Sequence, residues 1–74
     1  MRTITLVPDA WEHYQYWQGQ DKKTLKRINT LINEPLRGDL SGYWSRRIDD
    51  VNRLVYRATD SELIVIACRF HYDG

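Results

Sequence analysis

The sequence has 74 residues, among them three Trp, five Tyr and one Phe, and its formal net charge is +1 at pH 7. A chain of this length should form one domain over residues 1–74, with a small core that depends on large aromatic side chains. The near-neutral net charge argues against a generic nucleic-acid coat protein, although local groups of basic residues could still hold a phosphate backbone. A large substrate should therefore meet an open face rather than a deep cavity.

The cysteine content and the N-terminus indicate a cytoplasmic protein. Cys68 is the only cysteine, so no internal disulfide can form, and a secreted domain of this size would usually need one. Residues 2–7 lack the long apolar run of a signal peptide. No segment approaches the length of a bilayer span, so we expect no membrane contact.

The N-terminal half predicts a strand followed by two helices. Residues 3–6 alternate between β-branched and apolar side chains, as in a strand. Asp9 is the expected N-cap of the first helix, with Glu12 completing a capping box, and Gly19 is the expected end. Asp21 should then cap a second helix.

The second helix has an amphipathic pattern. An apolar stripe at helical spacing is formed by Leu25, Ile28, Leu31 and Ile32. Pro35 should push Glu34 out of the helical region into an extended conformation.

The C-terminal half predicts three strands, at residues 43–48, 53–58 and 62–70, joined by tight turns. Strands with such short connections pair antiparallel, so the two helices should cover one face of the resulting sheet. The fold class is therefore α+β.

Alternation along the last strand suggests which side chains face the helices. The more apolar set should face them and comprises Ile64, Ile66, Cys68, Phe70 and Tyr72. The alternate set should face away and comprises Leu63, Val65, Ala67, Arg69 and His71.

Several kinds of chemistry find little support. His13 and His71 are far apart and no cluster has metal-ligand spacing, so we expect neither a metal nor a cofactor. Cys68 falls on the apolar side of its strand, where free cysteine is usually a core filler. There is no glycine-rich phosphate loop. His13 is expected to be simply solvated.

The remaining polar candidates fit metal-free cleavage of RNA. This reaction needs a base for the 2′-hydroxyl, a cation for the phosphate and an acid for the departing 5′-oxygen. Glu, Arg and His can fill these roles. From the residues alone this is one option among many, because Glu-Pro is a common turn and a terminal His-Tyr is a common strand end.

Longer motifs add a resemblance to a known family. The matching segments are residues 9–17, 21–29, 34–36, 40–48, 52–56 and 69–72. They resemble YoeB toxins almost from end to end and in the same order. The run Ser41-Gly42-Tyr43-Trp44-Ser45-Arg46-Arg47 is the most specific of them.

The resemblance implies a RelE-like fold and the toxin of a type II toxin–antitoxin system. Such a toxin is a ribosome-dependent mRNA endonuclease that acts in the aminoacyl site, and a YefM-type antitoxin binds it. Exposed aromatic residues would also permit a homodimer. By position, Glu34 would be the general base, Arg53 the phosphate-stabilising cation, and His71 the general acid. Tyr72 would be the terminal aromatic that organises the site.

The basic residues expected to hold RNA are Arg37, Arg46 and Arg47. Two positions depart from the family pattern without removing a catalytic group: Asn52 stands where a His is common, and Phe70 where a Tyr is common.

A third departure is larger, because roughly a dozen residues of a family loop before Glu34 have no counterpart. Either the natural chain contains this loop, and catalysis is intact, or the loop is absent and the position of Glu34 changes. The second case would favour a catalytically impaired binding module that keeps the antitoxin contact. A gyrase-directed relative is a third reading, which the Glu, Arg and His-Tyr set disfavours.

Overall fold

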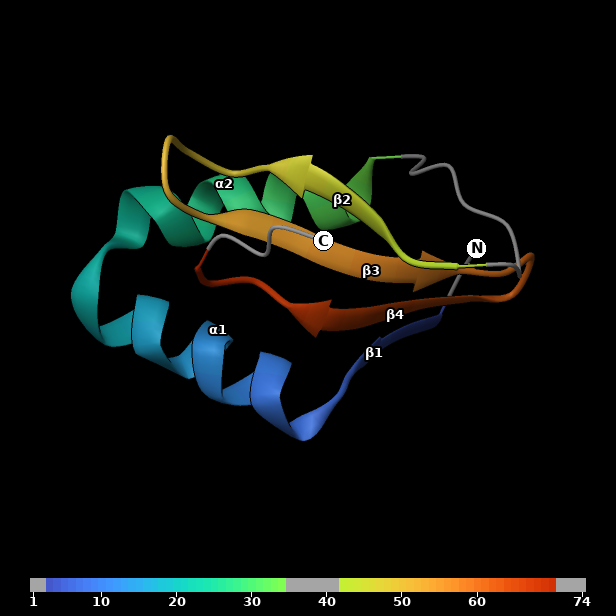
Figure 1. Ribbon diagram of the computed structural model, residues 1–74. Coiled ribbons are helices and arrows are strands. Elements are labelled where there is room, and N and C mark those ends of the chain that lie inside the picture. The colour runs from blue at the N-terminus through green and yellow to red at the C-terminus, as the bar shows by residue number, and fades with distance from the viewer. Residues whose placement is uncertain (1–2, 35–41, 71–74) are drawn as a thin grey trace.

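The computed structural model describes residues 3–34 and 42–70 and shows an α+β fold (Figure 1). The elements in chain order are β1 (Thr3–Leu6), α1 (Pro8–Gln20), α2 (Lys22–Asn33), β2 (Trp44–Arg47), β3 (Arg53–Ala58) and β4 (Glu62–Ala67). The predicted fold class is confirmed. The strands expected at residues 43–48 and 62–70 are shorter than the pattern suggested.

The strands form one sheet in the order β1-β4-β3-β2. The pairs β2–β3 and β3–β4 are antiparallel, as the short turns predicted. β1 adds to the other side of β4 in the parallel direction, which makes the sheet mixed. The two helices supply the long connection that a parallel strand requires before the chain returns to the sheet.

The start of α1 differs from the expectation. The helix begins at Pro8, and Val7 occupies the N-cap position without a side-chain cap. Proline is favoured here because it has no N–H to be satisfied and its φ angle is already helical. Asp9 therefore lies in the first turn, so its predicted role as N-cap and the capping box with Glu12 are wrong.

The boundary between the helices is closer to the prediction. α1 runs past Gly19 to Gln20, so the predicted end at Gly19 is one residue short. Asp21 caps α2 as expected, because its carboxylate accepts hydrogen bonds from the backbone N–H groups of Lys23 and Thr24.

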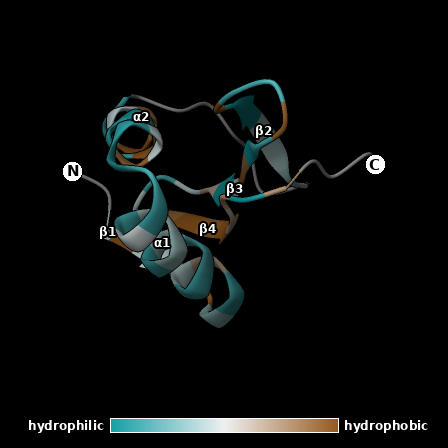
Figure 2. Cartoon of the chain, turned by 90° about the vertical axis from the view of Figure 1, so that its left-hand side faces the viewer, coloured by the Kyte–Doolittle hydropathy of each residue, from teal (hydrophilic) through white to brown (hydrophobic). Residues whose placement is uncertain are grey.

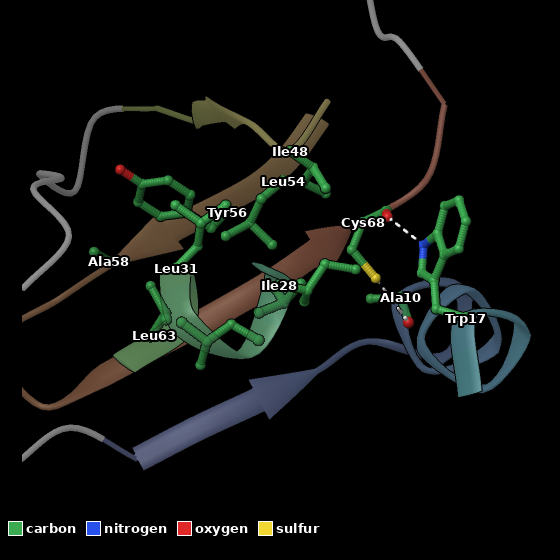
Figure 3. Close-up of a cluster of buried hydrophobic side chains, with 12 residues drawn as sticks. Ala10, Trp17, Ile28, Leu31, Ile48, Leu54, Tyr56, Ala58, Leu63 and Cys68 are labelled. Carbon is green, nitrogen blue, oxygen red and sulfur yellow. Dashed lines mark hydrogen bonds between the residues drawn. The ribbon is translucent and has the colours of Figure 1, made fainter. Parts of the chain in front are cut away.

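The core lies between α2 and one face of the sheet, with α1 closing the end where β1 and β4 finish (Figures 1 and 2). Ile28 and Leu31 of α2 are fully buried against Leu54 and Tyr56 of β3 (Figure 3). On the α1 side, the Trp17 indole donates a 2.8 Å hydrogen bond to the carbonyl oxygen of Cys68. The indole thus buries a large apolar area while its N–H keeps a hydrogen-bond partner, and this helps a short chain to form a dense core.

A β-bulge in β4 reverses part of the predicted facing. Val55 pairs with Ala67 and Tyr56 pairs with Val65, so Ile66 is an extra residue on β4. Before this residue, Leu63 and Val65 face the core; after it, Cys68 does. One inserted residue moves every later side chain to the opposite face.

The predicted helix-facing set is therefore wrong for Ile64 and Ile66, which are only partly buried, and right for Cys68. Phe70 is 49% exposed and does not belong to the core either. His71 and Tyr72, which the same prediction placed on opposite faces, lie outside the described residues. In the part of the chain that the structure describes, neither helix has the length and apolarity to cross a bilayer.

Candidate functional site

The register of β2 and β3 separates two groups of arginines. Leu54, Tyr56 and Ala58 face the core, so the alternate residues of β3 point away from α2. Directly opposed residues of antiparallel strands share a face. The face away from α2, called the outer face below, therefore carries Arg53, Val55 and Arg57 from β3 with Ser45 and Arg47 from β2.

Arg53 is held on the outer face by both its side chain and its backbone. Its Nε donates a 3.1 Å hydrogen bond to the Ser45 hydroxyl oxygen. Its backbone N–H donates a 3.1 Å hydrogen bond to the carbonyl oxygen of Phe70. The guanidinium group predicted to stabilise the phosphate is thus oriented by a neighbouring strand, and the backbone of the same residue is tied to Phe70.

Arg47 makes contacts within the turn after its own strand. Its guanidinium group forms an ion pair with the Asp50 carboxylate, and its Nε donates to the carbonyl oxygen of Asp49 at 3.3 Å. Both partners of the ion pair are well exposed, so the pair contributes little to stability. Arg47 remains accessible to an anion on the outer face.

Glu34 ends α2 and pairs with Arg46. Its backbone leaves the helical region, with φ −75° and ψ 155°, which confirms the extended conformation predicted from the proline that follows. Its Oε2 lies 3.3 Å from Nη2 of Arg46. Arg46 is opposed to Leu54 in the register, so this ion pair belongs to the helix side of the sheet.

The structure therefore joins the predicted site residues in two separate sets. Glu34 contacts Arg46 at the edge strand β2, while Arg53 contacts Ser45 on the outer face. Within residues 3–34 and 42–70, no hydrogen bond or ion pair links Glu34 to Arg53 directly. Arg37, His71 and Tyr72 lie outside the described residues, so their roles stay predictions.

The segment before His71 is anchored by Asn52, one of the two positions that depart from the family pattern. The Asn52 Oδ1 accepts a 2.7 Å hydrogen bond from the backbone N–H of Phe70. Its Nδ2 donates to both carboxylate oxygens of Asp49 at 3.1 Å. Phe70 has a φ of 70°, a left-handed conformation that is uncommon for a non-glycine residue and needs such support.

Asp49 itself is fixed by the turn between β2 and β3. Burial alone would raise the pKa of Asp49, but hydrogen bonds from the Val51 and Asn52 backbone N–H groups and from the Asn52 amide outweigh it and lower that pKa. The charged carboxylate therefore orients Asn52, which is itself buried. No local sequence signal connects Asn52 to Phe70, because the bond joins residues 18 positions apart.

Asn52, His13 and residues 68–70 together form a contact region that is called the junction below. The place of His13 in this junction corrects the expectation that it is simply solvated. Its Nδ1 accepts a 3.2 Å hydrogen bond from the backbone N–H of Cys68. Its ring is nearly perpendicular to that of Phe70, and the two ring centres are 6.0 Å apart. Burial and the nearby Arg69 guanidinium lower the pKa of His13 despite the acidic side chains of α1. The neutral ring is therefore the form that the fold favours.

The two remaining polar groups at the junction have structural roles. The Arg69 guanidinium carbon lies 3.5 Å from the centre of the Tyr16 ring and 4.4 Å from that of Phe70. Burial raises the pKa of the Cys68 thiol to about 12, so this cysteine is protonated and is not a nucleophile. Among the described residues, no three His, Cys, Asp or Glu side chains gather as a potential metal site.

The family is decided by a sequence match that covers most of the chain. Residues 6–72 match the YoeB-like toxins of bacterial type II toxin–antitoxin systems. The chain belongs to this family. The resemblance inferred from the motifs is confirmed, and with it the expected identity as the toxin of a type II system.

Individual relatives agree over nearly the whole chain. The toxin YoeB of Mycobacterium bovis is 48% identical over 85 residues, which cover 97% of this chain and 100% of the relative. Among solved structures, the YoeB dimer from Staphylococcus aureus has a TM-score of 0.82 at 38% identity and covers 96% of this chain and 98% of that one. A YoeB–YefM complex from the same species has a TM-score of 0.77 at 36% identity and covers 97% and 99%.

The alignments also bear on the missing loop. The match to the Mycobacterium bovis toxin is 85 residues long, although this chain has only 74. That relative therefore carries residues without a counterpart in this chain. In the structure Glu34 directly follows α2.

Proposed function

We propose that this toxin is a metal-independent endoribonuclease that cuts mRNA in the aminoacyl site of the ribosome. The Glu34 carboxylate would take the proton from a 2′-hydroxyl, whose oxygen then attacks the adjacent phosphorus. The bond from phosphorus to the 5′-oxygen breaks, leaving a 2′,3′-cyclic phosphate, and His71 would protonate the departing oxygen. Arg53 would stabilise the charge that develops on the phosphate, and Tyr72 would help to position His71.

The observation that carries this proposal is the joint anchoring of Arg53 and the C-terminal segment. The Arg53 backbone is bonded to Phe70, the residue that immediately precedes His71 in the chain. Arg53 also points its side chain along the outer face, bonded to Ser45. The proposed cation is thus hydrogen-bonded to the residue that comes directly before the proposed acid in the sequence. Arg37, Arg46 and Arg47 would bind further phosphates of the message.

The proposed base, Glu34, lies on the helix side of the sheet, whereas Arg53 lies on the outer face. Glu34 and Arg46 lie at an edge strand, where no further strand separates the two faces. An RNA phosphate bound by Arg46 would compete with the Glu34 carboxylate for the guanidinium group and release it. The substrate would therefore complete the site by replacing this ion pair.

For partners, we propose a YefM-type antitoxin and the ribosome, by analogy with the Staphylococcus aureus YoeB–YefM complex. The YoeB dimer of that species supports a homodimer of this chain as well. The site of action would be the cytoplasm, where translating ribosomes occur.

Growth arrest on expression tests the proposed roles. Glu34→Ala, Arg53→Ala and His71→Ala are each expected to abolish arrest while the circular dichroism spectrum stays that of the parent chain. If all three variants arrest growth as strongly as the parent, the assignment of the site is wrong.

The shortened connection favours one alternative function. If the altered position of Glu34 prevents proton transfer, the chain would be a binding module that keeps the antitoxin contact without cleavage. An error near 1 Å in a catalytic group can cost about 100-fold in rate. Such a module would bind a YefM-type antitoxin normally yet leave messages intact on the ribosome.

A further inference from the structure

The outer face contains an open hollow that the proposed roles do not use. It has a volume of about 300 Å³ and is lined by Asp9, Tyr43, Val55, Ile66 and Ala67. It lies where the bulge at Ile66 interrupts the pairing of β3 and β4. A bulge re-aims side chains and often lies beside functional sites.

The lining of this hollow combines three kinds of group. Three of its lining residues are apolar, namely Val55, Ile66 and Ala67. Tyr43 also lines it; this residue is 65% exposed, and the Arg57 guanidinium carbon lies 5.6 Å from the centre of its ring. The lining also includes Asp9, an acidic residue in the first turn of α1.

We infer that this hollow is a nucleobase subsite for the RNA, which extends the proposed function. A base has two apolar faces that can lie against apolar side chains and stack on an aromatic ring. Its phosphates would lie against the arginines of the outer face, since Val55 stands between Arg53 and Arg57 on β3. Apolar and cationic surfaces side by side fit a nucleotide better than they fit an apolar ligand or a simple anion.

The Asp9 carboxylate selects among the bases. It can only accept hydrogen bonds, so it favours a base with an exocyclic amino group. Guanine, adenine and cytosine have one, whereas the only donor on the Watson–Crick edge of uracil is N3–H, which is flanked by two carbonyl oxygens that the carboxylate would repel. The subsite should therefore disfavour uracil.

Titration of the isolated toxin with nucleoside 5′-monophosphates, followed by backbone amide NMR, tests this subsite. GMP, AMP and CMP should shift the amide signals of Tyr43, Val55 and Ile66, and UMP should bind more weakly. Ribose 5-phosphate, which has the phosphate without the base, should leave the Val55 and Ile66 signals unchanged. Equal shifts with ribose 5-phosphate, or none with any nucleotide up to its solubility limit, would overturn the inference.

Variants separate the stacking role from the selecting role. Tyr43→Ala should weaken GMP binding by about fivefold or more, whereas Tyr43→Phe keeps the ring and should retain it. Asp9→Ala should remove the discrimination against UMP, while Glu12→Ala removes a carboxylate from the same helix outside the hollow and should not. An unchanged base preference in Asp9→Ala contradicts the selecting role.

This test is independent of cleavage. A 5′-monophosphate contains no phosphodiester bond, so binding can be measured whether or not the chain is an active ribonuclease. Nucleotide binding without cuts on the ribosome would refute the proposed function and keep the subsite. Cuts on the ribosome without nucleotide binding would support the proposed function and refute the subsite.

Discussion

The two ends of the proposed site are supported in different ways. At the Arg53 end, Asn52 bonds both to Phe70 and to the charged Asp49, and the Arg53 backbone adds a further bond to Phe70. At the Glu34 end, the carboxylate is held by an ion pair with Arg46, and both side chains are partly exposed. The contrast suggests a rigid end that holds the proposed cation, Arg53, combined with a base that the substrate can reposition.

The largest effect is expected from the cation at the rigid end. Arg53→Ala should lower the rate of message cleavage by about 100-fold or more, because it removes charge stabilisation at the transferring phosphate. Its melting temperature should change little, since the bond from the residue 53 backbone to Phe70 remains. Arg27→Ala removes an exposed arginine of α2 and should cleave at the parent rate. A residual rate within threefold of the parent would show that Arg53 does not contact the reacting phosphate.

The next effect concerns the stability of the rigid end. Asn52→Ala leaves the Phe70 N–H without its acceptor and removes a donor to Asp49, which should cost about 1–3 kcal/mol of unfolding free energy. Urea unfolding followed by tryptophan fluorescence measures it. Asn33→Ala, which also removes an amide hydrogen bond but on an exposed helix surface, should cost less than about 0.5 kcal/mol. Equal costs for the two variants would mean that the junction is not specially stabilised.

A moderate pH effect should arise beside the same junction. The pKa of His13 is lowered in the folded chain, so the unfolded chain takes up a proton first as the pH falls. Its contribution to stability is complete above the ordinary value of 6.5 and is lost as the pH falls from there through the lower folded pKa. His13→Asn keeps an acceptor for the Cys68 N–H without titrating, so its unfolding free energy should fall less between pH 7 and pH 5. A steeper fall in this variant would contradict the assignment.

The smallest effect on stability is expected at the Glu34 end. A double-mutant cycle on Glu34 and Arg46 should give a coupling energy of about 0–1 kcal/mol, because both side chains are substantially exposed. Chemical denaturation of Glu34→Gln, Arg46→Gln and the double variant provides the cycle. A coupling above about 2 kcal/mol would show that this end is as firmly fixed as the other.

Local patterns predicted the elements well and their long-range contacts poorly. The stripe of α2, the cap at Asp21 and the strand over Arg53–Ala58 depend on neighbouring residues, and all three occur as expected. α1 begins at Pro8 and is not capped by Asp9, because the preference of proline for the first helical position outweighs a possible side-chain cap. The facing of β4 was wrong because the bulge at Ile66 has no signature in an apolar strand.

The sequence pointed to candidate site residues only where these belong to family motifs. Glu34 and Arg53 come from family motifs, and the register shows where their side chains lie. The anchoring roles of Asn52 and His13 depend on contacts 18 and 55 residues apart, which spacing along a chain cannot reveal. The Tyr43 hollow likewise requires the bulge and the packing of α1 beside the sheet.

Primer extension on messages bound to ribosomes, with and without the purified 74-residue chain, tests the central claim most directly. The proposed function predicts discrete cuts within codons at the aminoacyl site that persist in the presence of a metal chelator added after assembly, and that disappear with Arg53→Ala. Intact messages with the parent chain, under conditions in which it still binds a YefM-type antitoxin, would contradict it and establish the binding module instead.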